Sequence, residues 1–251
     1  MNRMRSQIFR QYDTKWGNLK YPSGKYTMSR SGCGCCSCAH LIIEMDKYKS
    51  YTPKTIRPYM VKQGFATLGN GTTWNGITKT LEHYGYKVVK PNISYSMDAA
   101  WKELNKGNRA GILLFGAGSR GGVTWTTGGH YVAFLDYKVK NGKHYFYTKD
   151  SGGRCHDGWY CYETTMRGLL PQMWIVELPK QKPVTYVVGK TYTLQEAMNI
   201  RTGASTSYKK VAVYSKGTKV KCLQVSKDGK WIRIAKNKWV CGKGSNEIYI
   251  K

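Results

Sequence analysis

The feature that most constrains the fold is a break in the pattern at Leu178-Pro179-Lys180-Gln181-Lys182-Pro183. Two prolines and two lysines without apolar periodicity favour an extended linker, because proline fixes its own φ and restricts the residue before it. The 251 residues suffice for two domains, each with a core of its own. We therefore predict one domain over residues 1–178, a linker over 179–185 and a second domain over 186–251.

Before the break, helical patterns precede strand patterns. A helix is expected to begin near Cys33 and to continue to Met45, and two more helices are expected over 73–84 and 96–104. Aromatic and β-branched residues predict strands over the ranges 110–115, 131–137, 144–149 and 173–178. Helices followed by an antiparallel sheet indicate an α+β domain.

After the break, short β-patterns separated by glycines predict a small all-β barrel, with strands at 186–188, 198–201, 219–225, 231–234 and 239–241. The stretches that resemble the bacterial SH3 family are Met198–Thr206, Lys216–Val220, Trp231–Ile234 and Lys238–Val240. That resemblance implies an SH3-like barrel that binds peptidoglycan peptides without catalysis. Trp231 and Trp239 are the candidate wall-binding residues, and core packing is the alternative role for both.

Three residues far apart in the sequence have the chemistry of a thiol hydrolase. Cys33 lies at a predicted helix start, where the helix N-terminus and a nearby imidazole lower the pKa of a thiol and create a nucleophilic thiolate. His130 opens a predicted strand, and Asp150 closes the next one, where its carboxylate would orient the imidazole. Each residue alone also has a structural interpretation, as a buried thiol, a core histidine or the start of a turn. Their order and their places on the predicted elements favour a catalytic triad.

The same residues fall in blocks that resemble papain-like peptidases related to the double-glycine bacteriocin-leader peptidases. The blocks are Gln11–Gly17, Ser31–Gly34, Gly128–Val132 and Lys149–Ser151, and the resemblance covers most of residues 9–178. It implies a papain-like cysteine hydrolase domain with Cys33 as nucleophile, His130 as general base and Asp150 as orienting residue. Trp74 and Trp125 are the candidate substrate-binding residues of this domain.

One departure from the family concerns the residues after the nucleophile. The family usually continues Cys-Gly with Pro-Thr, whereas this chain continues with Cys35-Cys36-Ser37-Cys38, so Cys36 is the second candidate nucleophile. The backbone N–H of Cys33, at a helix N-terminus, is the expected donor to an oxyanion. Gln11 and Tyr26 are the candidate side-chain donors.

The cysteines have a second interpretation, as zinc ligands. Four of the eight cysteines fall between residues 33 and 38, and paired spacings of this kind are typical of structural zinc sites. The candidate ligands are Cys35, Cys36, Cys38, Cys155, Cys161 and His156. We favour reduced cysteines packed near the site, and we expect neither a metal nor another cofactor.

The charge of the chain indicates a polyanionic partner. Lys and Arg number 41 against 14 Asp and Glu, and the resulting formal net charge of +27 attracts anionic polymers over long distances. Residues 1–180 carry 26 basic and 11 acidic side chains, a charge of +15, and residues 181–251 carry 15 and 3, a charge of +12. The basic residues are scattered singly, without the long runs typical of nucleic-acid-binding arms. We expect Gram-positive peptidoglycan and its anionic polymers as partners, and no nucleic acid.

The N-terminal residues Met1–Arg10 lack the apolar stretch of a secretory signal, and no apolar run approaches the ~20 residues that span a bilayer. We expect synthesis in a host cytoplasm, no stable membrane insertion, and access to the wall through a membrane pore. Together these features predict a phage endolysin that cuts an amide bond in the peptide part of peptidoglycan, as a cysteine peptidase or an N-acetylmuramoyl-L-alanine amidase. The alternatives are a non-catalytic wall-binding protein and a bacteriocin-leader peptidase.

The triad depends on the register between the strands that carry His130 and Asp150, because a slip of one residue reverses the face of every side chain. We expect His130 opposite Asp150, with a connection of five residues over 138–142. The Asn141-Gly142 pair favours a tighter two-residue hairpin. That hairpin places Asp150 opposite Ala133, on the wrong face, unless a bulge corrects it.

If the charge of +27 brings the protein to anionic wall polymers, salt should slow wall lysis. Raising the ionic strength from about 0.1 M to about 1 M shortens the Debye length from about 10 Å to about 3 Å. We expect the initial rate of lysis of purified Gram-positive walls to fall over that range while the circular dichroism spectrum stays unchanged. A constant rate would assign recognition to short-range contacts instead.

Overall fold

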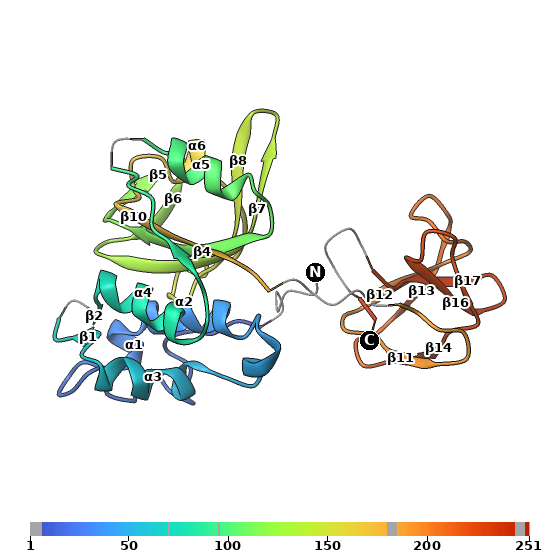
Figure 1. The fold of residues 1–251 in the computed structure, drawn as a ribbon, viewed down its shortest axis with the longest axis horizontal. Helices are drawn as coiled ribbons and strands as arrows, with labels where there is room; N and C mark the ends of the chain where they lie inside the picture. Colours follow the sequence, from blue (N-terminus) through green and yellow to red (C-terminus); the bar gives the residue numbers. More distant parts are fainter. Residues whose placement is uncertain (1–6, 70, 95, 180–184, 244–248, 251) are drawn as a thin grey trace. The chain divides into compact units, whose positions relative to one another are not determined.

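The computed structural model describes residues 7–69, 71–94, 96–179, 185–243 and 249–250 (Figure 1). The chain divides between Lys180 and Gln181 into two compact units. This division falls inside the predicted linker, of which residues 180–184 lie outside the described part of the chain.

Most helices of the larger unit precede most of its sheet, as the sequence predicts. They are α1 (Met28–Ser31), α2 (Cys33–Ile42), a 3-10 helix (Asp46–Tyr48), α3 (Pro53–Lys62), α4 (Trp74–His83), α5 (Asp98–Leu104) and α6 (Tyr162–Thr165). The helix after Cys33 ends at Ile42 rather than Met45. The prediction omits α3, because Pro58 lies inside that helix and disguises its pattern. No helix in the described ranges is long and apolar enough to cross a bilayer.

The larger unit contains a six-stranded antiparallel sheet in the order β3-β10-β4-β7-β8-β9. Its strands are β3 (Val88–Val89), β4 (Arg109–Phe115), β7 (His130–Lys140), β8 (Lys143–Lys149), β9 (Gly158–Cys161) and β10 (Gln172–Glu177). Two small sheets pair β1 (Ala66–Thr67) with β2 (Gly71–Thr72) and β5 (Gly118–Arg120) with β6 (Val123–Thr126). Figure 1 shows α2, α3 and α4 on one face of the large sheet and α5 and α6 on the other. This mixed α/β architecture agrees with the prediction.

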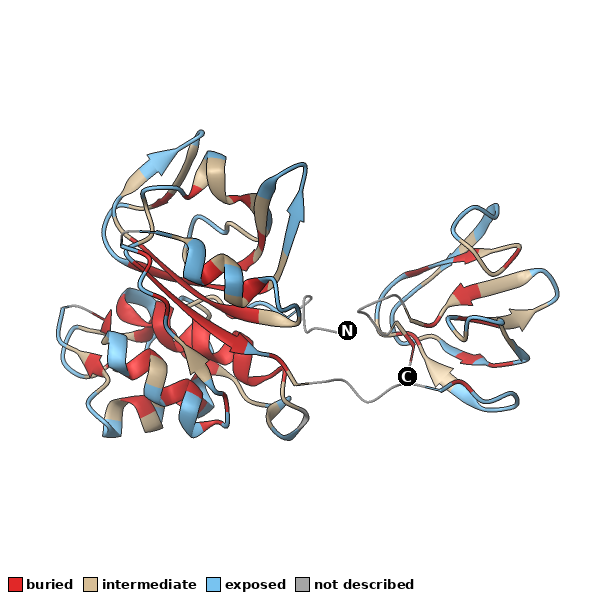
Figure 2. Ribbon diagram, turned by 45° about the horizontal axis from the view of Figure 1, so that its top comes forward, coloured by how far each residue is buried: buried red, intermediate tan, exposed pale blue. Residues whose placement is uncertain are grey.

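Helix α2 is buried along its whole length against strand β7. The residues from Cys33 to Ala39 are all small, so the helix axis can lie close to the sheet. At this contact the Ser37 hydroxyl donates to the carbonyl oxygen of Tyr131, with an Oγ–O distance of 3.0 Å. Figure 2 shows β4 and the first half of β7, at the centre of the large sheet, as mostly buried. The run of cysteines is therefore explained by close packing.

The expected register between β7 and β8 is wrong, and the structure shows how the triad residues still meet. The loop is the tight Asn141-Gly142 hairpin, with Lys140 opposite Lys143 and with φ of 50° and 67° at the two loop residues. In that part of the ladder, even-numbered residues pair with odd-numbered ones, which would put His130 and Asp150 on opposite faces.

A β-bulge at Leu135 returns the side chains of His130 and Asp150 to the same face of the sheet. The register shifts between Phe134 and Asp136, so that Phe134 pairs with Thr148. Even-numbered residues now pair with even-numbered ones, and His130 and Asp150 therefore face the same side of the sheet. The predicted five-residue connection over 138–142 is replaced by a two-residue loop plus one inserted residue.

The smaller unit is all β, as predicted. A five-stranded antiparallel sheet has the order β13-β12-β17-β16-β15, and β11 pairs with β14. The strands are β11 (Thr191–Thr193), β12 (Met198–Arg201), β13 (Lys210–Tyr214), β14 (Lys219–Lys221), β15 (Gln224–Val225), β16 (Trp231–Ala235) and β17 (Lys238–Cys241). The predicted strand at 186–188 is not formed, and β13 was not foreseen. The resemblance to SH3 domains stays a prediction.

Gly111 in β4 leaves no room for a side chain beside β10. A Cβ atom added at Gly111 would lie 1.9 Å from the backbone carbonyl oxygen of Trp174. We expect Gly111→Ala to lower the free energy of unfolding of the larger unit by about 1–3 kcal/mol, because the strands must move apart. Urea denaturation followed by tryptophan fluorescence measures the change. Gly128→Ala is the matched control, since a Cβ there meets no atom within 4 Å, and equal stability of the two variants would contradict the close contact.

Candidate active site

Cys33 is the first residue of α2, and a sharp junction between two helices places it there. Gly32 both ends α1 and caps α2. A Cβ atom at Gly32 would lie 2.6 Å from the carbonyl oxygen of Met28, so the junction requires glycine. The N–H groups in the first turn of a helix have no partner within the helix. The backbone N–H of Cys33 is thus available beside its own thiol, as an oxyanion donor requires.

His130 and Asp150 meet across β7 and β8. His130 Nε2 lies 2.7 Å from Asp150 Oδ1, and the Asp150 side chain is completely buried. The same carboxylate accepts the N–H of Gly152 at 2.7 Å and the N–H of His156 at 3.1 Å. Asp150 therefore remains a fixed, charged acceptor that holds the imidazole ring in one orientation.

The Cys33 thiol interacts electrostatically with the same imidazole ring. Burial raises the pKa of Cys33, but the hydrogen bond and the charge of His130, with backbone N–H groups of Tyr131 and Gly34, outweigh it and leave the pKa below its ordinary value. Because Nε2 is engaged with Asp150, Nδ1 is the ring nitrogen that remains for the thiol. The three residues therefore form one continuous chain, from thiol to imidazole to carboxylate.

The pKa values of the histidine and the aspartate move apart. Burial lowers the pKa of His130, but the hydrogen bond to Asp150 and the neighbouring Cys33 raise it to about 10. Burial raises the pKa of Asp150, but His130 and the N–H groups of Gly152 and His156 lower it to about 2. This arrangement favours a thiolate beside an imidazolium ion at neutral pH.

The other cysteines between residues 33 and 38 lack the lowered pKa that His130 gives to Cys33. Cys36, the second candidate nucleophile, has no exposed surface, and burial raises its pKa well above the ordinary value, as it does for Cys35 and Cys38. The later candidate zinc ligands lie with other partners: Cys155 beside Tyr12 and Cys161 beside Glu163. In the described ranges, no group of three or more His, Cys, Asp or Glu side chains is placed to hold a metal ion.

An ion pair behind Asp150 was not predicted. The guanidinium group of Arg10 donates to the backbone carbonyl oxygen of Asp150 and to the carboxylate of Asp157. Asp157 Oδ1 in turn accepts the backbone N–H of Asp150 at 3.0 Å. Both backbone groups of Asp150 are thereby fixed, which makes Arg10 and Asp157 positioning residues. No local pattern joins positions 10 and 157, so the sequence offered no signal for this pair.

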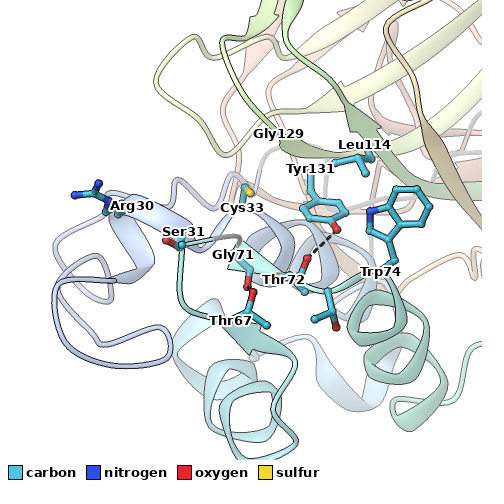
Figure 3. Close-up of a pocket in the computed structure, with 12 residues that line it drawn as sticks. Arg30, Ser31, Cys33, Thr67, Gly71, Thr72, Trp74, Leu114, Gly129 and Tyr131 are labelled. Atoms are coloured by element: carbon cyan, nitrogen blue, oxygen red, sulfur yellow. Dashed lines mark hydrogen bonds between the residues drawn. The ribbon is translucent and has the colours of Figure 1, made fainter.

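Two hollows flank the Cys33–His130 pair. The larger, of about 510 Å³, is an open cleft that includes Cys33, Arg30, Thr72, Trp74 and Tyr131 among its lining residues (Figure 3). The smaller, of about 140 Å³, is lined by His130 and Asp150 together with Gln11, Thr126 and Arg154, among others. A substrate can therefore approach the thiol from one side and the imidazole from the other.

The candidate oxyanion donors differ in their placement. Gln11 lines the smaller hollow, where its Nε2 already donates to the carbonyl oxygen of Ser29 at 2.7 Å. Tyr26 lines neither hollow, and its ring lies under the guanidinium group of Arg30. Gln11 is therefore the better placed of the two.

The four tryptophans that the sequence suggested as binding residues differ in how far they are exposed. Trp74 lies on the cleft with 45% of its surface exposed. Trp125 is only 1% exposed and stacks on Phe115 in the core, yet it is also among the residues that line the smaller hollow beside His130 and Asp150, so its substrate-binding role stays a prediction. In the smaller unit, Trp231 is buried on β16, and Trp239 is partly buried on the adjacent β17. Trp239 is therefore the better placed of the two for a ligand contact.

The pKa directions predict selective alkylation of Cys33. Between about pH 5 and about pH 10, iodoacetamide should modify Cys33 at a lower pH than it modifies glutathione added to the same sample, because the thiolate is the reactive form and the pKa of Cys33 lies below its ordinary value. Peptide mass spectrometry measures both rates in one sample. Asp150→Asn removes the charge that supports the imidazolium ion, so it should move the Cys33 midpoint upward by about one pH unit. A Cys33 midpoint at or above that of glutathione would contradict the thiolate–imidazolium pair.

Comparisons with known proteins gave structural similarities alone. No protein-family model matches the sequence, and no curated protein matches it. The peptidase domain of Streptococcus ComA, a bi-functional ABC transporter involved in quorum sensing, is 16% identical, with a TM-score of 0.42 over 60% of this chain and 93% of that chain. Ly7917, crystallised with the hydrolysing product of MDP, is 17% identical, with a TM-score of 0.26 over 74% of this chain and 77% of that chain. At these identities and TM-scores, the similarities carry no argument about function. The functional argument depends on the geometry of the site.

Proposed function

We propose that this chain is a peptidoglycan hydrolase of the endolysin type, which cleaves an amide bond in the peptide part of the bacterial wall. The observation that carries the proposal is the chain of contacts from Cys33 through His130 to Asp150 at the head of a buried helix, opening on a cleft. Amide hydrolysis by a thiol needs these groups in this order.

In the first half of the reaction, the Cys33 thiolate attacks the carbonyl carbon of the scissile amide. The negative charge that develops on the carbonyl oxygen is stabilised by the free N–H of Cys33, with Gln11 as the second candidate donor. The protonated His130 then donates its proton to the amide nitrogen, and the C–N bond breaks. An amine leaves, and the acyl group remains on the sulfur as a thioester.

In the second half, a water molecule takes the place of the amine. The neutral His130 removes a proton from this water, and the resulting hydroxide attacks the thioester carbonyl carbon. The C–S bond breaks, a carboxylic acid is released, and the thiolate–imidazolium pair is restored. Asp150 keeps the ring orientation constant through both proton transfers.

The smaller unit supports the choice of the cell wall as substrate. It carries +12 of the net charge of +27 and has the all-β architecture expected of a binding module. Its predicted role is to hold the enzyme on anionic walls, with Trp239 as the better placed aromatic contact. A leader peptidase acting on a soluble precursor would not need such a unit.

The proposal predicts that a single substitution abolishes wall lysis and leaves wall binding unchanged. In the full-length chain, Cys33→Ala should abolish release of soluble fragments from purified Gram-positive walls, because the nucleophile is lost. The variant should still sediment with the walls, because the smaller unit is unchanged. Turbidity clearing and a pull-down assay measure the two properties.

Cys36→Ala is the matched control, three positions further along the same helix. It removes a buried sulfur with no surface, so lysis should stay within about threefold of the unmodified chain after a small loss of stability. Lysis that survives Cys33→Ala would exclude Cys33 as the nucleophile, whereas wall binding without lysis by the unmodified chain would leave a non-catalytic wall-binding protein. Cleavage of a leader peptide without cleavage of walls would favour the peptidase alternative.

A further inference from the structure

The cleft at Cys33 has two chemically different ends. Figure 3 shows Arg30 and Ser31 at one end, Trp74 and Leu114 at the other, and Cys33 between them. Among the described lining residues, Arg30 is the one charged side chain, and none is acidic. One end of the cleft is therefore formed by Arg30, whose exposed guanidinium group extends away from Cys33 in Figure 3, and the other end is aromatic.

The aromatic end is rigid. Trp74 is the first residue of α4, whose cap residue Thr73 accepts the N–H of Gly76 at 3.0 Å. The Trp74 ring packs edge to face on the buried Trp174, with 6.3 Å between ring centroids, and Lys90 Nζ lies 5.1 Å from the Trp74 ring. A half-exposed indole fixed in this way is a preformed platform for an apolar group.

The cationic end combines a guanidinium group with a free hydroxyl. The Arg30 guanidinium lies over the Tyr26 ring, 5.7 Å from its centroid, and pairs with no carboxylate in the described part of the chain. The side chain of Ser31 is largely buried at the cleft, yet its hydroxyl makes no hydrogen bond to any described residue. By contrast, the threonine hydroxyls of the cleft all form hydrogen bonds within the protein, namely those of Thr67, Thr72 and Thr73.

We propose that the Arg30–Ser31 end binds a free carboxylate of the substrate while Trp74 contacts an apolar group on the other side of the scissile amide. A guanidinium group and a neighbouring hydroxyl supply the N–H and O–H donors that a carboxylate accepts, and charge-assisted bonds of this kind are strong. The substrate class is thus an acidic peptide amide. This inference rests on the proposed hydrolase function and adds the selection of its substrate.

The test compares two forms of one substrate on the full-length chain. Soluble fragments of Gram-positive peptidoglycan are used as prepared and after their carboxylates have been converted to primary amides with carbodiimide and ammonia. The unmodified protein should show a KM about tenfold higher for the amidated form with a similar kcat, because the lost contacts act in binding. Arg30→Gln should raise the KM for the acidic form to that of the amidated form, and Arg30→Lys should retain part of the preference.

Two further variants separate local recognition from the general field of the protein. Lys62→Gln removes the same charge from an exposed position at the end of α3, outside the cleft, and should keep the preference for the acidic form. Trp74→Ala should raise the KM for both forms equally. Equal cleavage of the two forms by the unmodified protein, or an unchanged preference in Arg30→Gln, would overturn the carboxylate site while leaving the hydrolase function intact. Cleavage of neither form by folded protein whose Cys33 still alkylates would remove the proposed function, and this inference with it.

Discussion

Helix α2 packs directly on strand β7, and the hydrogen bond from the Ser37 hydroxyl to the Tyr131 carbonyl oxygen lies within that contact. The contact sets the distance between the thiol on the helix and the imidazole on the strand, because Cys33 begins α2 and His130 begins β7. Larger side chains in the first two turns of α2 would push the helix away from the sheet. Another side of α2 is packed closely against β2, since a Cβ at Gly34 would lie 2.4 Å from Thr72 Oγ1.

Burial raises the free energy of the charged groups in this site. An ionised carboxylate or thiolate taken out of water is stable only when hydrogen bonds and opposite charge replace the lost hydration. Asp150 receives two backbone N–H groups and His130, while Arg10 and Asp157 hold its own backbone groups. The site is thus a line of alternating charges, in which each member lowers the free energy of its neighbour's charged form.

Recognition divides into a long-range and a short-range part. The charge of +27 is spread over both units and attracts any anionic polymer, so it raises the encounter rate without selecting a bond. Selection requires contacts beside the thiol, where Arg30 and Trp74 lie at the two ends of the cleft. The two parts respond differently to experiment, because salt screens the first and substitution in the cleft removes the second.

The sequence by itself determined the order of the elements, the division near residue 180 and the helix start at Cys33, because these depend on local periodicity and on proline and glycine positions. It also named Cys33, His130 and Asp150, which the structure brings together. Only the tertiary structure decided how they meet: the tight hairpin and the bulge at Leu135 restore the shared face, and a bulge has no local sequence signature here. The burial of Trp125 and the pairing of Arg10 with Asp157 were likewise decided by packing between distant segments, which no local pattern encodes.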